Sequence, residues 1–265
     1  MTTQTQGTAE VNGRLWGAKA RAWADIQEAS ARPLYLDVLA LHAVGAGTAY
    51  LDVGCGAGLA LQLAAERGAN VTGLDASAAL LDIARERVPA AELHVGELES
   101  LPFADDRFDV VTGFNSFQYA AQPLGALAQA RRVAKPGGRV IIATWSPPDR
   151  TQAAAVLGAL KPLLPPPPPG APGPFALSDE AVLRKLASDA ELTPGEVRDV
   201  DCPFVYPDVE TGVRGLGSAG VAERAARHSG ADAVDAAHRA VLEKFRRADG
   251  SVFIANAFRY LVATR

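Results

Sequence analysis

The chain has 265 residues, 48% of them hydrophobic, so it can bury one large core, and its length allows one or two domains. The net charge is −4, with acids and bases spread through both halves and no basic tract, which argues against nucleic acid as a partner. Residues 1–13 are polar and no apolar run approaches the length of a membrane span, so we expect neither a secretion signal nor a membrane helix. The two cysteines, Cys55 and Cys202, lie far apart, which fits a cytoplasmic protein without a metal site.

Residues 14–44 are predicted to form one or two helices, after a frayed segment over residues 1–13. Apolar side chains recur there at helical spacing: Trp16, Ala20, Trp23, Ile26, Leu34, Val38 and Leu41. Trp16 and Trp23 stand seven residues apart on one helical face, and core packing is the default interpretation of this pair.

Residues 50–58 read Tyr-Leu-Asp-Val-Gly-Cys-Gly-Ala-Gly, an apolar strand that runs directly into three alternate glycines before an Ala/Leu-rich helix. Without a Cβ, such a turn lets the backbone approach a ligand, and the helix N-terminus behind it presents unpaired N–H groups to the same place. The pattern is typical of the nucleotide-binding corner of a doubly wound α/β sheet. A dinucleotide fingerprint needs a small third residue where this chain has Leu59, so that fingerprint fails. A purely structural turn is the alternative.

A second predicted strand, residues 70–75, ends in Asp75 and follows the first strand by one helix, as a βαβ unit requires. An acid at the tip of this strand can accept hydrogen bonds from both hydroxyls of a ribose. The alternative is that Asp75 caps the helix that starts near Ser77.

Two further strands are predicted before and after a loop that contains Glu97 and Leu98. The second of them carries Asn115 to the carboxyl edge of the sheet, where ligands bind in folds of this type. A Pro-Gly-Gly turn at residues 136–138 then stops a helix and opens a fifth strand over residues 140–143.

In this order, the pieces across residues 49–145 resemble the motifs of the class I S-adenosylmethionine-dependent methyltransferases, of the small-molecule UbiE-like or type 11 family. The segment Asp-Val-Gly-Cys-Gly-Ala-Gly is similar to motif I, and the resemblance implies S-adenosyl-L-methionine as the cofactor. It assigns Asp75 to the ribose, Glu97 to the adenine amino group, although Asp is more frequent there, and the amide of Leu98 to the ring. It also implies that the leading helix covers the cofactor. The implied cofactor-binding residues are Asp52, Gly54, Cys55 (as a small residue that fills the turn), Gly56, Asp75, Ala76, Glu97, Leu98, Asn115 and Trp23.

The second half of the chain is less regular. A proline run at residues 165–169 predicts a rigid loop. A sixth strand is predicted over residues 196–206 and a final strand over 252–263, which the resemblance places antiparallel between the fifth and sixth strands. The expected architecture is a Rossmann-like, doubly wound α/β sheet of seven strands in a single methyltransferase domain, residues 1–265, with lid helices in 14–44, a cofactor-binding core in 49–145, and a substrate-side half in 146–265 that carries a helical insertion of two or three helices at 208–248.

Methyl transfer from a sulfonium is an in-line displacement that depends on positioning the acceptor and excluding water, and it needs no metal. A general base is needed only where the acceptor atom still holds a proton. Tyr119, just past the fourth strand, is our candidate for contact with the acceptor, and His228 in the inserted block is the candidate base. A solvated surface histidine is the alternative for His228. Trp145 and Tyr206 are candidates for the pocket wall.

Three functions follow as hypotheses. The first is an S-adenosylmethionine-dependent methyltransferase for a small, uncharged or hydrophobic acceptor, with no nucleic acid and no membrane as partner. The second is a protein that binds the same cofactor for other chemistry or for binding alone. The third is a nicotinamide-dependent oxidoreductase, which Leu59 disfavours. The acceptor, the methylated atom and the oligomeric state cannot be predicted from the sequence.

Overall fold

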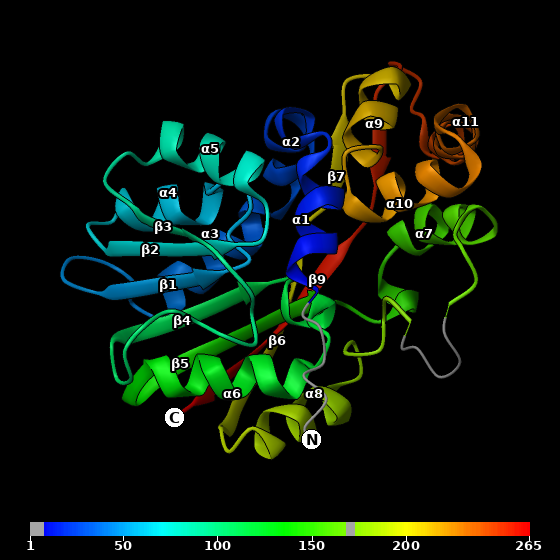
Figure 1. The fold of residues 1–265 in the computed structure, drawn as a ribbon. Helices are drawn as coiled ribbons and strands as arrows, with labels where there is room; N and C mark the ends of the chain where they lie inside the picture. The colour runs from blue at the N-terminus through cyan, green and yellow to red at the C-terminus, as the bar shows by residue number, and fades with distance from the viewer. Residues whose placement is uncertain (1–7, 168–172) are drawn as a thin grey trace, which may run out of the picture.

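The computed structural model describes residues 8–167 and 173–265. In these ranges seven strands form one sheet in the order β3-β2-β1-β4-β5-β9-β6 (Figure 1). Neighbouring strands from β3 to β5 are parallel, and β9 is antiparallel to both β5 and β6. The final strand therefore inserts where the family resemblance places it. The strands are β1 (Ala49–Val53), β2 (Asn70–Asp75), β3 (Glu92–Val95), β4 (Phe108–Phe114), β5 (Ala134–Trp145), β6 (Thr193–Asp201) and β9 (Ala257–Thr264).

Helices cover both faces of this sheet because side chains alternate along its buried strands. Tyr50 and Ile141 pack into one core, whereas Leu51 and Ile142, their next neighbours, pack into the other. Figure 1 shows α4 and α5 on one side of the sheet and α6 and α8 on the other. α3 packs beside α4. The bounds of the five helices are α3 (Arg32–Leu41), α4 (Leu59–Ala65), α5 (Ala78–Arg87), α6 (Pro123–Val133) and α8 (Glu180–Asp189). The α/β doubly wound prediction is confirmed.

The leading segment is more broken than one or two helices. It contains α1 (Ala9–Gly17), α2 (Ala20–Ala22), a π-helical turn (Trp23–Gln27) and a 3₁₀ turn (Glu28–Ala31) before α3. Residues 9–13 are helical, so the prediction of a frayed start is wrong for them, and residues 1–7 lie outside the described ranges. Turns of π-helix inside a helical run often occur at functional sites, which draws attention to this segment.

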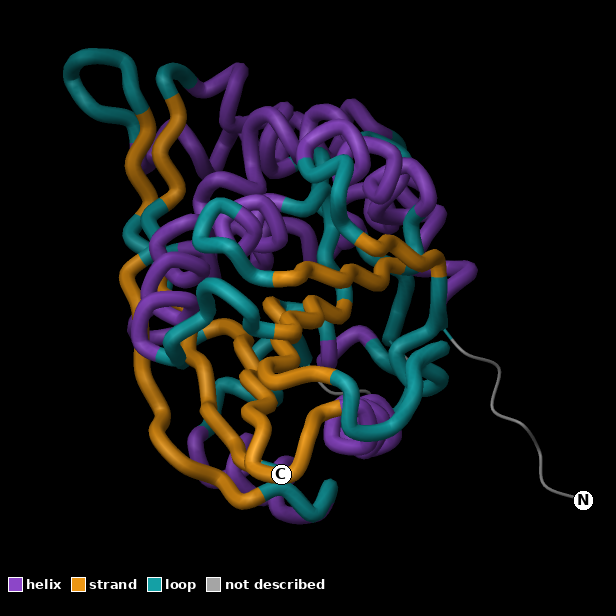
Figure 2. Tube along the Cα trace, turned by 90° about the vertical axis from the view of Figure 1, so that its left-hand side faces the viewer, coloured by secondary structure: helices purple, strands orange, loops and turns teal. Residues whose placement is uncertain are grey.

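The predicted sixth and final strands are each divided in two, so their prediction as single strands is wrong. Beyond β6 the chain continues as β7 (Phe204–Tyr206), which pairs with β8 (Val252–Ile254) in a separate two-stranded ribbon. The break falls at Cys202, whose N–H donates to the carbonyl of Asn256 at 2.8 Å, and at Pro203, which has no N–H to donate. Figure 2 shows paired strands standing beyond the main sheet, beside helices.

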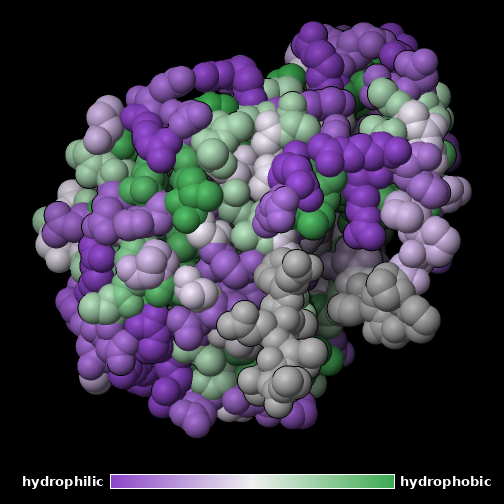
Figure 3. Space-filling view, viewed as in Figure 1, coloured by the Kyte–Doolittle hydropathy of each residue, from purple (hydrophilic) through white to green (hydrophobic). Residues whose placement is uncertain are grey.

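The block after β7 is helical, with α9 (Val209–Leu216), α10 (Gly220–Ser229) and α11 (Ala231–Leu242), and α7 (Ala153–Leu160) packs against α11. Leu160, Ala222, Ala225 and Val234 give this block a buried cluster of its own. No helix in residues 8–167 and 173–265 is long and apolar enough to cross a membrane. The face of the molecule shown in Figure 3 is mostly hydrophilic, with smaller hydrophobic areas between. The predicted proline loop lies partly outside the described residues.

Candidate cofactor site

The glycine-rich turn after β1 has the geometry that a close ligand requires. Gly54, Gly56 and Gly58 have φ values of +78°, +55° and +84°, which side chains adopt rarely. A Cβ on Gly54 would overlap the Cβ of Ser116, so this glycine is required by packing. A Cβ on Gly56 would instead lie 3.6 Å from Oε1 of Glu28. The middle glycine therefore faces the leading segment rather than the core.

Asp75, at the tip of β2, is held beside this turn by the backbone. Its Oδ2 accepts from the N–H of Gly56 and its Oδ1 from the N–H of Ser77, both at 2.8 Å. The side chain is buried, and burial raises its pKa although both amides favour the charged form. A carboxylate offers about four lone-pair positions, so each oxygen keeps capacity for a further donor. The N-cap of α5 is Ser77, not Asp75.

Asp52 lies in the strand before the turn and belongs to a buried polar chain. Its Oδ1 accepts from the hydroxyl of Thr112 at 2.8 Å, and that hydroxyl pairs with the phenol of Tyr50 at 2.7 Å. Burial raises the pKa of Asp52 to about 7, against the lowering effect of the hydrogen bond from Thr112 and with a contribution from the charges of Asp75 and Glu28. Three buried carboxyls thus share this corner of the fold, and each has a raised pKa.

Glu28 and Arg87 are functional candidates that sequence reasoning missed. Glu28 is 3% exposed, forms an ion pair with Arg87, and accepts from the N–H of Leu59 at the start of α4 at 3.4 Å. Arg87 also donates to the carbonyls of Ala57 in the turn and Ala24 in the leading segment, at 3.0 and 2.9 Å. Burial outweighs the attraction of Arg87 and raises the pKa of Glu28. This pair fastens the leading segment to the glycine turn.

An aromatic cluster stands beside the turn. The rings of Trp16 and Trp23 are 4.9 Å apart, and those of Trp16 and Tyr119 are 5.7 Å apart, all edge to face. Nε1 of Trp23 lies 3.7 Å from the position of a Cβ on Gly56, so the ring lies against the turn. Burial raises the pKa of Tyr119 to about 12, which keeps its phenol neutral at ordinary pH. Tyr119 can therefore orient an acceptor by hydrogen bonding, whereas it is poorly suited to remove a proton.

Of the predicted adenine-side groups, Glu97 is bonded by the leading helix and the amide of Leu98 is bonded by Glu97. Oε2 of Glu97 accepts from the N–H of Ala9 at 2.7 Å, and its Oε1 accepts from the N–H of Leu98 at 3.0 Å. Ala76 lies against α1, because a Cβ on Gly13 would overlap its carbonyl. Contact with the base would require Glu97 to use its remaining lone pairs or to release Ala9.

Asn115 and Cys55 lie at the carboxyl edge of the sheet, whereas His228 lies on an inserted helix. Asn115 has φ of +53° and accepts from the amide of Gln118 at 3.1 Å. Cys55 is buried, burial holds its pKa well above the ordinary value, and its Sγ lies against Gly73, which agrees with a space-filling role. His228 is exposed near the end of α10, and among the described residues no hydrogen bond or ring contact joins it to the other candidates. The solvated surface histidine is the better interpretation of His228.

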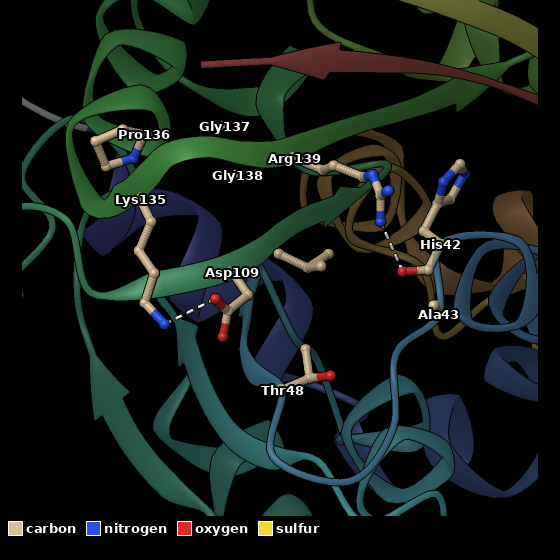
Figure 4. Close-up of a pocket in the computed structure, with 10 residues that line it drawn as sticks. His42, Ala43, Thr48, Asp109, Lys135, Pro136, Gly137, Gly138 and Arg139 are labelled. Carbon is tan, nitrogen blue, oxygen red and sulfur yellow. Dashed lines mark hydrogen bonds and ion pairs between the residues drawn. The ribbon is translucent and has the colours of Figure 1, made fainter.

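Two hollows among the described residues lie at the other end of the sheet. One, of about 290 Å³, is lined by Thr48, Asp109, Lys135 and Arg139, at the amino ends of β1 and β4 (Figure 4). Its basic groups are already engaged, Lys135 with Asp109 at 2.7 Å and Arg139 with the carbonyl of His42 at 2.9 Å. It is therefore not the site of the motifs, which meet at the carboxyl ends of the strands.

Comparison with known proteins agrees with this arrangement. Residues 51–142 match the family model described as a methyltransferase domain. A ubiquinone biosynthesis O-methyltransferase of Alkalilimnicola ehrlichii is 39% identical over 133 residues, 48% of this chain and 54% of the relative. A demethylmenaquinone methyltransferase of Renibacterium salmoninarum is 38% identical over 112 residues, 42% of this chain and 47% of the relative. The matches thus span about half of these curated relatives.

Structural similarity extends further along the chain than sequence similarity. The YcgJ protein from Bacillus subtilis superimposes with a TM-score of 0.58 and 18% identity, over 87% of this chain and 97% of that one. The fold is therefore shared outside residues 51–142 as well, including the segments whose sequences have diverged. Residues 51–142 therefore resemble a methyltransferase domain, and the sequence motifs and the sheet order described above agree with that resemblance.

Proposed function

We propose that this chain is an S-adenosyl-L-methionine-dependent methyltransferase that acts on a small, uncharged or hydrophobic organic acceptor. The observation that carries the proposal is the joint geometry of the glycine turn and Asp75. Two backbone amides hold the carboxylate at the carboxyl edge of the sheet, with lone pairs left for a ribose diol. The match of residues 51–142 to a methyltransferase domain and the methyltransferase names of the curated relatives support the same activity.

The charge around the turn favours a cationic cofactor. Asp52, Asp75 and Glu28 are buried close together, and Arg87 offsets part of their charge. A pyrophosphate would add negative charge to a corner where the carboxyl pKa values are already raised. A sulfonium would instead lower these pKa values and be stabilised by the ionised acids. The acidic corner therefore favours S-adenosyl-L-methionine over a nicotinamide dinucleotide. Leu59 agrees with this preference, because it stands where the dinucleotide fingerprint needs a small residue.

The residues would divide the work by position along the sheet edge. Asp75 takes the ribose and Glu97 takes the adenine amino group, and the amide of Leu98 takes the ring once it leaves Oε1 of Glu97. Asn115 and the turn at Gly54 and Gly56 take the methionine end. The remaining members of the proposed set are Asp52, which supports the strand, Cys55 and Ala76, which shape the turn, and Trp23, which covers it.

The bound cofactor would supply the methyl group to the acceptor in one displacement. The chain would position the acceptor against the methyl group and exclude water from the site. Trp16, Trp23 and Tyr119 form an aromatic wall that suits an apolar acceptor. Tyr119 would orient the acceptor as a hydrogen-bond donor, and we assign no base to His228. We propose a single cytoplasmic domain over residues 1–265, with 14–44 as the lid, 49–145 as the cofactor core and 146–265, including the insertion 208–248, on the acceptor side.

Calorimetry with S-adenosyl-L-methionine, S-adenosylhomocysteine and NAD tests the cofactor. We expect both sulfur compounds to bind and NAD not to bind at the same concentrations. Incubation with methyl-labelled cofactor and a panel of phenols, quinols and small amines then tests the transfer. Binding of the cofactor without label transfer to any member would favour the second hypothesis, a binding protein or an enzyme of other chemistry. Tighter binding of NAD than of both sulfur compounds would refute the proposal.

A further inference from the structure

The turn between α2 and α3 presents neighbouring side chains to two different parts of the molecule. Glu28 contacts the glycine turn and Arg87, as described above. Gln27, the residue before it, points to the other side, where its Oε1 accepts from the phenol of Tyr206 at 2.6 Å. Gln27 is 5% exposed and Tyr206 is 2% exposed, so this hydrogen bond is buried. Tyr206 ends β7 and leads directly into α9, the first inserted helix.

The leading segment and the inserted helices α9 and α10 pack closely against each other. Gly215 of α9 has no room for a side chain, because a Cβ there would lie 2.8 Å from Cγ2 of Ile26 and 3.1 Å from Oε1 of Gln27. Gly220 of α10 faces Trp16 in the same way, with 2.8 Å to its Nε1. The inserted helices thus rest directly on the leading segment, and cores packed this tightly shift between discrete arrangements rather than deform.

A buried hydrogen bond between neutral groups is the specific connection in this contact. The phenol of Tyr206 donates to Gln27, and burial raises the pKa of this phenol, so it keeps its proton. The other end of the Gln27 side chain, its Nε2, donates to the hydroxyl of Ser30 at 3.4 Å within the leading segment. The side-chain amide of Gln27 is therefore bonded at one end within the leading segment, and at the other end to Tyr206, which leads into the inserted helices. The hydroxyl of Tyr206 is therefore engaged in this contact.

We propose that Gln27 and Tyr206 are positioning residues that couple cofactor occupancy to the placement of the inserted helices over the acceptor. The proposal rests on the proposed function. A cofactor at the glycine turn contacts Trp23 and Glu28 and fixes the leading segment, and Gln27 passes that constraint to Tyr206 and α9. Coupling between two binding events is reciprocal, so the same bond favours cofactor binding when the inserted helices are in place.

The test is Tyr206→Phe, which removes one hydroxyl, with Tyr260→Phe as the matched control. Tyr260 is also a buried tyrosine with one hydrogen bond, to Asp37 on α3 at 2.8 Å, and it lies outside the proposed coupling. We expect Tyr206→Phe to weaken binding of S-adenosylhomocysteine three- to ten-fold in calorimetry, the effect of losing one neutral hydrogen bond. Tyr260→Phe should bind like the parent. Gln27→Met is the second variant, and its effect should not add to that of Tyr206→Phe.

Hydrogen exchange separates coupling from a merely structural role. In the parent, S-adenosylhomocysteine should slow exchange in residues 24–31 and in residues 209–242, whereas in Tyr206→Phe protection of the second segment should be lost. A folded Tyr206→Phe or Gln27→Met protein with the parent's affinity and the parent's protection of residues 209–242 would overturn the coupling alone. Failure of the parent to bind either sulfur compound would overturn the proposed function and, with it, the coupling.

Discussion

Replacement of Asp75 by Ala tests the carboxylate on which the cofactor assignment depends. Asp75 is 9% exposed, and its two oxygens hold the N–H groups of Gly56 and Ser77 while keeping lone pairs for a ligand. The substitution removes the charged acceptor of a ribose diol, and hydrogen bonds to a charged group contribute about 1.5–3 kcal/mol. Part of the loss is offset by water that enters the emptied space, so we expect affinity for S-adenosylhomocysteine to fall roughly ten- to a hundred-fold.

The assay is calorimetric titration of folded protein, with circular dichroism and thermal melting to verify the fold. Asp75→Ala also releases two backbone amides of the turn, so a lower melting temperature than that of the parent is expected. Asp82→Ala is the matched control, because Asp82 is an exposed acid on the helix that follows, paired at the surface with Arg85 at 2.6 Å. This control should bind like the parent. A folded Asp75→Ala protein with undiminished affinity for S-adenosylhomocysteine would refute the assignment of Asp75 to the ribose. Asp75 would then have only a structural role, in holding the glycine turn.

Three further variants probe the same corner and the buried titratable groups. Gly56→Val places a branched side chain at φ +55° beside Trp23, so the protein should fold but show no thermal stabilisation by S-adenosylhomocysteine; stabilisation equal to that of the parent would make the turn purely structural. His238 is fully buried and burial lowers its pKa from 6.5 to about 4, so the unfolded state binds more protons there and stability should fall by on the order of 3 kcal/mol as pH drops from 6.5 to 4. His238→Leu should flatten that part of the urea-unfolding profile, whereas His228→Ala should not. Asp52 acts in the opposite sense: its pKa is raised from 3.8 to about 7, so its contribution to stability falls by a few kcal/mol as pH rises through that range, and Asp52→Asn should remove this loss at pH 8.

The parts of the fold that could be predicted from the sequence are those that depend on local pattern. The glycine turn, the acid at the end of β2 and the alternating strands around them each reflect a few neighbouring residues. The antiparallel place of the final strand between the fifth and sixth strands followed from the family resemblance and is confirmed. The break between β6 and β7 was missed because it depends on contacts between Cys202 and Asn256, which are 54 residues apart. Nothing in the alternation of residues 196–206 marks that bend except Pro203.

The histidines show why helix faces are harder to predict than helices. His228 and His238 both lie in the inserted block, and both belong to amphipathic helices whose partners the sequence does not identify. In the structure His228 is exposed, whereas His238 is buried with both ring nitrogens unpartnered among the described residues. The preference for His228 as a base rested on position along the chain, and position along the chain does not determine which side of a helix packs.

The sequence of the leading segment carries a further signal of its contacts. Ala20, Ala24, Gln27, Glu28 and Ala31 follow one another at helical spacing on the side that becomes buried or partly buried. Two adjacent polar residues on such a stripe would each lose solvation without a partner, so their presence implies partners from elsewhere in the fold. The structure supplies Tyr206 for Gln27 and Arg87 for Glu28, which are 179 and 59 residues away. A polar pair on an apolar stripe therefore marks a junction between segments, and here the junction lies between the glycine turn and the inserted helices.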